Sequence, residues 1–208
     1  MMHNGRMEPK LEPFPLHELR PTQITVGYRE VGRKRDEWAL RSKDEKPGYL
    51  GRHMIPAVAG PGGQHWIIDH HHLALALIEE GVEQVLVSIV AHLGHLKPAA
   101  FMTFMDNRNW LHPFDEKGHR QDYDALPRRI GKLADDPYRS LAGELRRAGG
   151  YAKTDTPYSE FLWADFLRGR IKRSKLDEKF DASVKKALAI AESEDAKHLP
   201  GWAGISDD

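Results

Sequence analysis

The stretch "WIIDHHHLALALIEEG", residues 66–81, carries the pattern from which the fold can be deduced. A short apolar run ends at Asp69, and three consecutive histidines follow it. Behind the histidines, apolar residues recur four positions apart, as in Leu73 and Leu77, which is the spacing of a helix. Gly81 stands where the C-terminal cap of that helix is expected. The stretch therefore predicts a strand that passes directly into a helix at the histidines.

The flanking segments extend this unit on both sides of the predicted helix, 70–80. Gly60-Pro61-Gly62-Gly63 separates two short apolar runs and indicates a hairpin, because glycine supplies the positive backbone angles of a tight turn. Residues 82–93, "VEQVLVSIVAHL", are rich in β-branched side chains and predict a buried strand. Residues 19–31 are predicted to be extended, with three side chains alternating on one side: Ile24, Val26 and Tyr28. The highly charged stretch at 32–48 predicts a solvated helix followed by a loop.

Beyond residue 95 the pattern becomes helical. Asp136 precedes Pro137, which is typical of a helix start, and Gly149-Gly150 indicates the end of that helix. We therefore expect a polar lead over residues 1–15, an α/β core over 16–95 and a helical region packed on that core over 96–208.

Composition excludes several classes of protein. The 208 residues contain 31 Lys plus Arg and 31 Asp plus Glu, so the net charge is zero and nothing draws the whole chain toward nucleic acid or anionic membrane. Cysteine is absent, which excludes disulfides, thiolate catalysis and zinc–thiolate sites, so any metal ligands must be His, Asp or Glu. No window approaches the roughly 18 apolar residues of a membrane span. We expect a soluble, cytoplasmic protein with no membrane partner.

The histidine run is a candidate site on physical grounds. Asp69 occupies a favoured N-cap position, where its carboxylate would accept hydrogen bonds from the first turn of the helix. His70, His71 and His72 would then occupy that turn, whose amides and positive dipole end favour an anion such as phosphate. Imidazoles there could donate to phosphate, carry protons near neutral pH or bind a metal. Because adjacent helical residues point about 100° apart, the three cannot all serve one ligand.

The order of elements around "IIDHHHLALALIEEG" resembles the ParB/sulfiredoxin-type fold, in which an Asp-Gly-His-His-Arg-like motif opens a helix over a nucleotide phosphate site. The segments "LRPTQITVGYREV", "DDPYRSLAGELRRAGGY" and "YSEFLWADFLRGRI" extend the similarity to the ParB-like nuclease family of stand-alone bacterial proteins, over residues 16–175. The resemblance implies an α/β (α+β) fold, with a small mixed sheet and its helices followed by a mainly helical C-terminal half.

The motif can be carried over residue by residue. Asp69, His71 and His72 match its aspartate and two histidines, whereas His70 replaces its glycine and Leu73 its arginine. A guanidinium grips phosphate by two hydrogen bonds and leucine cannot, so another cation, such as Arg29 or Arg52, would have to contribute. In relatives that act as free-serine kinases a glutamate from the early segment serves as base, and Glu30 is the candidate here.

The resemblance implies a nucleotide such as ATP or CTP, or a phosphorylated small molecule, bound with Mg²⁺ at the Asp69–His72 turn. His71 and His72 would contact phosphate, and His70 is a further candidate for that contact. Asp69 would position the metal or cap the turn, and Glu30 would activate a water or hydroxyl. Nuclease, NTPase and small-molecule kinase activities all remain open.

Three alternatives stand beside this hypothesis. The basic cluster "RGRIKRSK", 168–175, could bind DNA backbone through Arg168, Arg170, Lys172 and Arg173, although no helix-turn-helix is recognisable. The chain could be an interaction protein that keeps the fold without catalysis, which Leu73 favours. It could also be a metal-dependent hydrolase, in which His65, near the rim of the same site, or others such as His53 and His92 would complete the ligand set.

Overall fold

The computed structural model describes residues 11–204, which divide into two compact units. The first contains residues 11–24, 31–113 and 121–133, and the second contains residues 25–30, 114–120 and 134–204. Each unit is thus assembled from three separate stretches of chain. These boundaries differ from the contiguous division into a lead, a core and a helical region that we expected from the sequence.

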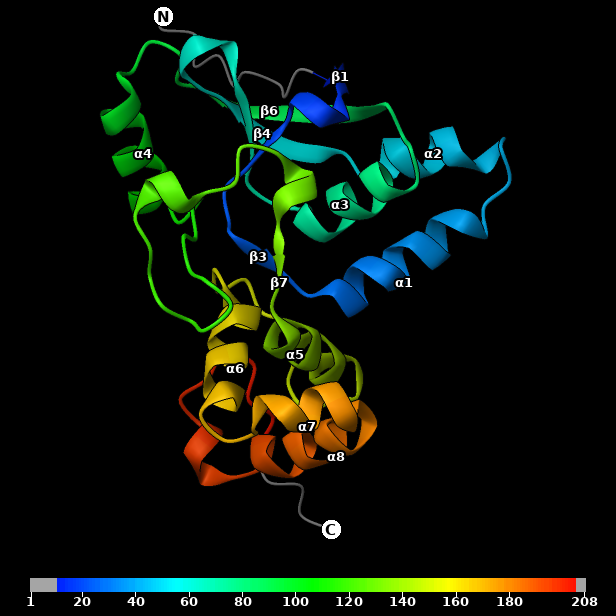
Figure 1. The fold of residues 1–208 in the computed structure, drawn as a ribbon, viewed down its shortest axis with the longest axis vertical. Helices are drawn as coiled ribbons and strands as arrows, with labels where there is room; N and C mark the ends of the chain where they lie inside the picture. The colour runs from blue at the N-terminus through cyan, green and yellow to red at the C-terminus, as the bar shows by residue number, and fades with distance from the viewer. Residues whose placement is uncertain (1–10, 205–208) are drawn as a thin grey trace, which may run out of the picture. The chain divides into compact units, whose positions relative to one another are not determined.

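A five-stranded mixed sheet organises the first unit, in the spatial order β1-β6-β4-β5-β2 (Figure 1). β6 is antiparallel to β1 and parallel to β4, β4 is antiparallel to β5, and β5 is parallel to β2. The strands are β1 (Leu11–Pro15), β2 (Arg20–Pro21), β4 (Ile55–Ala59), β5 (His65–Ile67) and β6 (Gln84–His92). The predicted mixed sheet is confirmed. Residues 11–15, which we had assigned to a polar lead, form one of its edge strands.

The predicted hairpin is β4, a single turn of 3-10 helix at Pro61–Gly63, and β5. Gly62 and Gly63 have φ angles of 68° and 72°, where a side chain would be strained. The Gly60 amide donates to the Gln64 carbonyl at 2.8 Å and closes the loop. This turn brings β5, and the histidine run that follows it, back along the sheet.

Helix α3, His71–Glu79, confirms the central prediction. It is apolar around nearly its whole circumference, and residues 73–77 are all buried, as expected of a helix enclosed by its own unit. Gly81 has a φ of 70°, its amide donates to Ile78, and the Val82 amide donates to Leu77 at 2.9 Å. This pair of hydrogen bonds is the Schellman arrangement, which ends the helix where the sequence predicted.

Two expectations for the early chain were wrong. The segment 19–31 is not extended throughout, because α1 (Tyr28–Ala39) already begins at Tyr28 and only β2 and β3 (Thr25–Val26) are strands. The expected loop contains a further helix, α2 (Glu45–Arg52). Glu45 accepts hydrogen bonds from both the backbone amide and the hydroxyl of Ser42 at 2.9 Å, which ties the preceding residues to the start of α2.

The remaining helix of the first unit is α4, Pro98–Asn107. Its Phe101 and Met105 are fully buried and belong to one cluster with Val58 of β4 and Trp66 of β5. The helix therefore packs on the β4–β5 hairpin.

The second unit is mainly helical (Figure 1, yellow-green to red). A short parallel pair, β3 with β7 (Ala134–Asp135), joins its segments. Its helices are α5 (Pro137–Arg147), α6 (Ser159–Arg168), α7 (Arg173–Glu178) and α8 (Phe180–Ala191). Asp136 caps α5 by accepting from the Tyr138 amide at 3.0 Å, and α5 ends before Gly149, so both predicted ends are confirmed. Within residues 11–204, no helix has the length and hydropathy needed to cross a bilayer.

Candidate functional site

The turn that enters α3 is built differently from the simple cap that we predicted. His70, not Asp69, occupies the N-cap position, and it does so in the left-handed conformation, with φ 63° and ψ 26°. The exposed Asp69 carboxylate accepts from the amide of His70 at 2.6 Å, while the His70 side chain makes no capping hydrogen bond. A left-handed residue followed by a helical one turns successive backbone N–H groups toward one point, which is an anion-binding geometry.

The left-handed backbone explains one departure from the family motif. The motif has glycine at this position, and glycine adopts positive φ without steric cost. Histidine is among the few other residue types that are enriched there. His70 therefore preserves the turn although it replaces the glycine.

His71 is a buried structural residue, only 5% exposed. Its Nε2 atom accepts a hydrogen bond from the backbone nitrogen of Thr22 at 3.1 Å, and the Thr22 hydroxyl donates to the Ile67 carbonyl at 2.8 Å. Because an amide can only donate, this bond requires Nε2 to be unprotonated. The Nε2 atom of His71 is thus engaged in holding the turn to the segment before β3.

His70 and His72 are both partly buried, and the surroundings of His70 favour its neutral form. Burial lowers the pKa of His70; the negative charge of Asp69 opposes this, and the nearby His53 and Lys34 reinforce it. The Nδ1 atom of His70 is buried and has no hydrogen-bond partner among the described residues. A neutral imidazole can donate one hydrogen bond and accept another.

Lys34 and His53 are neighbours of the turn that the sequence alone did not place there. Lys34 lies on α1, where its ammonium is 2.9 Å from a Glu37 carboxylate oxygen. His53 ends α2, where its Nδ1 lies 2.8 Å from the Tyr49 carbonyl and its ring stacks on that of Tyr49. The sequence suggested His53 only as a possible metal ligand, and nothing in the sequence indicated that Lys34 lies near the turn.

Leu73 points into the core and is 4% exposed. The position that carries arginine in the motif therefore supplies apolar packing in this chain, and no cation extends from it. Arg52, proposed as a substitute, lines an open hollow of the first unit between α1 and α2, together with three carboxylates: Glu37, Asp44 and Glu45.

The structure brings together no metal-ligand set around His65. The His65 ring packs against Phe14, with 4.4 Å between ring centroids, and its Nδ1 is buried without a partner. Within residues 11–204, no three His, Asp or Glu side chains are grouped as metal ligands. The hydrolase alternative based on His65 and Asp69 therefore gains no geometric support.

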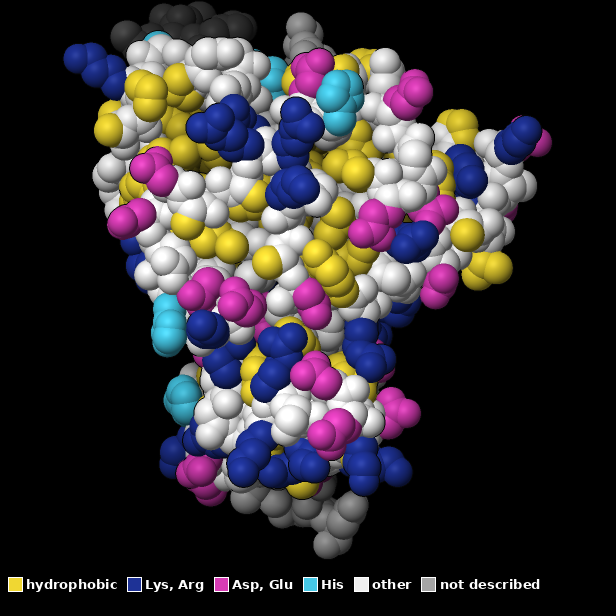
Figure 2. Space-filling view, in the orientation of Figure 1, with side chains coloured by type: hydrophobic (Ala, Val, Ile, Leu, Met, Phe, Trp, Pro, Cys, Tyr) yellow, Lys and Arg dark blue, Asp and Glu magenta, His cyan; other side chains and the backbone are white. Residues whose placement is uncertain are grey.

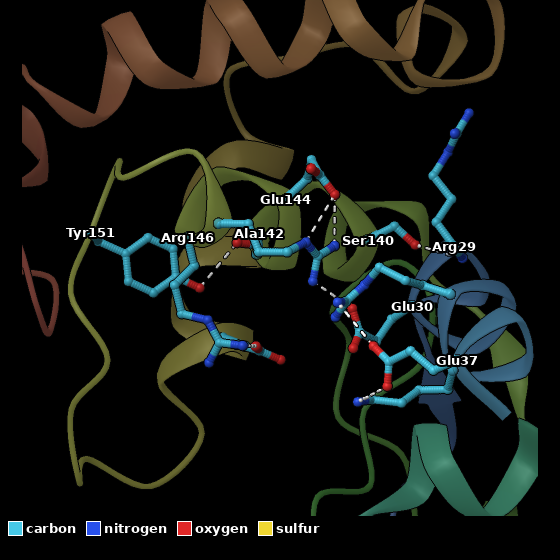
Figure 3. A network of polar contacts seen from close by, with 12 residues as sticks. Arg29, Glu30, Glu37, Ser140, Ala142, Glu144, Arg146 and Tyr151 are labelled. Carbon is cyan, nitrogen blue, oxygen red and sulfur yellow. Dashed lines mark hydrogen bonds and ion pairs between the residues drawn. The ribbon is translucent and has the colours of Figure 1, made fainter. Parts of the chain in front are cut away.

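Two of the predicted site residues, Arg29 and Glu30, belong to the second unit, where the Arg29 backbone and the Glu30 side chain contact α5 (Figure 3). The Arg29 guanidinium stacks over the Phe180 ring at 3.8 Å, and its backbone amide donates to the Ser140 hydroxyl. The Glu30 carboxylate pairs with Arg147 at 2.6 Å, and Arg147 also pairs with Glu144. Both residues thus take part in contacts that fasten the start of α1 to α5.

Comparison with known proteins gives the chain its family. The sequence model described as "Putative ParB-like nuclease" matches residues 13–169. The chain belongs to the ParB-like nuclease family. The resemblance inferred from the Asp69–His72 motif is confirmed at this level.

Two solved structures are similar to this ParB-like protein. The crystal structure of protein Atu1540 from Agrobacterium tumefaciens is 50% identical, with a TM-score of 0.91, and the match covers 96% of this chain and all of that one. The C-terminally truncated chromosome-partitioning protein ParB from Caulobacter crescentus, complexed with CTP-gamma-S, is 16% identical, with a TM-score of 0.31, over 90% of this chain and 94% of that chain. Among curated proteins, none matches the chain.

Proposed function

We propose that this ParB-like protein binds the phosphate groups of a nucleotide, such as ATP or CTP, at the turn from Asp69 to His72. The observation that carries the proposal is the left-handed N-cap of α3, whose own side chain makes no capping bond. The first amides of a helix have no acceptor within the helix, and its dipole adds positive potential there. The short bond from the His70 amide to Asp69 supports the affinity of this turn for an anionic oxygen.

Side-chain donors around the turn would bind phosphate in place of the motif arginine, which this chain lacks. His72 is the second residue of α3 and is partly exposed, and Lys34 is the nearby full positive charge. Binding would require Lys34 to exchange part of its ion pair with Glu37 for a phosphate oxygen. His71 would act through position, because its contact with Thr22 holds the turn in shape.

A magnesium ion is compatible with this site only as a partner of the nucleotide. Mg²⁺ keeps several waters and is commonly bound by one or two carboxylates together with substrate phosphates. Asp69 is exposed and offers one such carboxylate, and within residues 11–204 no two further acidic or histidine side chains are grouped with it as ligands. When bound, the ion would neutralise phosphate charge, and Asp69 would turn from the His70 amide toward it.

Phosphoryl transfer or hydrolysis, by an NTPase, kinase or nuclease, is an extension of the proposal that needs a base. Glu30 is the candidate from the family resemblance, and it is ion-paired with Arg147. Serving as base would require that pair to open. Binding can therefore be tested first, and catalysis only in a protein that binds.

The experiment is a thermal-shift titration of the full chain with Mg²⁺ and, separately, ATP, ADP, CTP, GTP and inorganic phosphate. Binding to the native state raises the free energy of unfolding by RT ln(1 + [L]/Kd), about 2.7 kcal/mol at a hundredfold excess over Kd. The shift should be lost in His72→Ala and Lys34→Gln. It should persist in His119→Ala, which removes an exposed histidine of the second unit. No shift with any nucleotide, or an equal shift in all variants, would rule the site out.

A further inference from the structure

We propose that a groove between α7 and α8 docks the phosphodiester backbone of nucleic acid, independently of the Asp69–His72 turn. The groove lies entirely within the second unit and has a volume of about 420 Å³. Five of its eight lining residues are cations and none is acidic; the full lining is Arg170, Ile171, Lys172, Lys175, Lys179, Ala182, Ser183 and Lys186. Figure 2 shows Lys and Arg side chains gathered over α7 and α8.

The floor of the groove is buried and hydrogen-bonded. Ile171 is 1% exposed and Ser183 4%, and the Ser183 hydroxyl lies 3.1 Å from the carbonyls of both Lys175 and Lys179. Those contacts fix the junction at which α7 passes into α8. The exposed lysines of the groove therefore extend from a buried, hydrogen-bonded base.

Several of the groove cations are available to a ligand. Lys172 and Lys179 are exposed, and neither ammonium has a hydrogen-bond or carboxylate partner within residues 11–204. The Lys186 ammonium is bound only loosely, at 3.4 Å from the Arg170 carbonyl. Lys175 forms an exposed pair with Glu178 at 3.4 Å, a kind of interaction that contributes little and exchanges readily.

This surface differs from the linear basic cluster that the sequence suggested. Arg168 is mostly buried and holds Asp136 at 2.7 Å, so it is committed to the interior of the unit. Arg173 pairs with Asp177 across one turn of α7 and does not line the groove. In the folded chain the groove instead gains Lys179, at the junction of α7 and α8, and Lys186 of α8.

Lysine content favours a nucleic-acid backbone over a compact ligand. A lysine ammonium is a point charge without the planar fork of arginine, and it binds phosphate without fixing its orientation. A row of such charges matches the repeated phosphates of a strand, whose bound counterions are released on association. The methylene stem of a lysine can pack along apolar surface, such as the face of a sugar or a base, while its ammonium stays in water.

The same surface lacks what a membrane would need. None of the large exposed apolar side chains of the described residues lies on α7 or α8. The apolar face of α8, including Phe180, Ala187 and Ala191, is enclosed in the core of the second unit. Interfacial helices insert apolar side chains into the lipid, and this one has none to offer.

The test is fluorescence anisotropy of the full chain with labelled 30-base-pair duplex DNA of two unrelated sequences, at several salt concentrations. We expect binding to both sequences, with an affinity that falls steeply as salt rises. The variant Lys172→Gln/Lys179→Gln/Lys186→Gln should bind about tenfold more weakly or worse. Its slope of log affinity against log salt should be smaller by about 2 to 3, since each lost contact removes about 0.9.

The matched control is Lys97→Gln/Lys153→Gln/Lys185→Gln, which changes the net charge equally at exposed lysines outside the groove, one of them on α8. It should keep the wild-type slope and most of the affinity. Equal losses in both variants, a flat salt response, or no binding by the wild type would overturn the proposal. Loss of binding to vesicles of phosphatidylcholine and phosphatidylserine in the groove variant, without any effect on DNA, would also overturn it. His72→Ala should leave DNA binding unchanged, which separates this test from that of the nucleotide site.

Discussion

The Nε2 atom of His71 accepts the hydrogen bond of the Thr22 backbone amide at 3.1 Å, in the interior of the first unit. One histidine of a run that looks like a row of ligands is thus part of the structural frame of that run. The other residues of that turn, Asp69, His70 and His72, are the ones whose side chains reach the surface at least in part. Four predictions follow from particular contacts of this kind.

Replacing His71 should destabilise the protein. His71→Ala removes buried volume and leaves the Thr22 amide without its acceptor, and we expect a loss of about 2 to 3 kcal/mol in the free energy of unfolding. His71→Gln, whose side-chain carbonyl can accept the same bond, should recover part of that loss. Urea denaturation followed by circular dichroism measures both. An unchanged midpoint in His71→Ala would contradict the structural role.

The pair Arg168–Asp136 should dominate the stability of the second unit. The Asp136 side chain is 3% exposed, so removing the guanidinium leaves a buried carboxylate whose remaining partner is the Tyr138 amide that it caps. Arg168→Ala should cost about 3 kcal/mol. Arg173→Ala, which breaks an exposed pair, should change stability by less than about 1 kcal/mol. Chemical denaturation of the two variants measures both changes in the free energy of unfolding. Equal changes would contradict the role given to the buried pair.

The protein should lose stability on acidification in a way that depends on His70. Burial lowers the pKa of His70, so below about pH 6.5 the unfolded chain binds a proton that the native state resists. The native state is therefore penalised as pH falls below that value. His70→Asn, which tolerates the left-handed backbone, should show a smaller loss of stability between pH 7 and 5.5. Identical pH profiles would show that another group is responsible.

Gly81 should not tolerate a side chain. Its φ of 70° closes the Schellman turn of α3, and a Cβ there would meet no neighbouring atoms, so the cost is purely conformational. Gly81→Ala should reduce stability by about 1 to 2 kcal/mol. Gly51→Ala, inside α2 with equally open space and no positive φ, should increase it by about 0.5 to 1 kcal/mol. Thermal unfolding of the pair tests the sign in each case.

Much of the fold could be predicted because its signals are local. The helix period behind His70, the glycines at 60–63 and 81, and the cap at Asp136 depend only on nearby residues. The motif also gave the candidate site, the turn from Asp69 to His72. Which of the three histidines is buried could not be predicted, because this depends on the contact of His71 with Thr22, 49 residues away.

The sequence by itself determined the helix that opens at the histidine run, because periodicity, capping and turn chemistry act over a few residues. It also determined the family and the mixed sheet, through the resemblance that its motifs carry. Only the tertiary structure decided where α1 begins. Its first amide, at Tyr28, is capped by Asp135 at 2.8 Å, and a Cβ at Gly27 would lie 2.7 Å from the Ser140 amide nitrogen. Those partners are more than 100 residues distant, so a segment whose alternation favours a strand becomes a helix once long-range hydrogen bonds outweigh local preference.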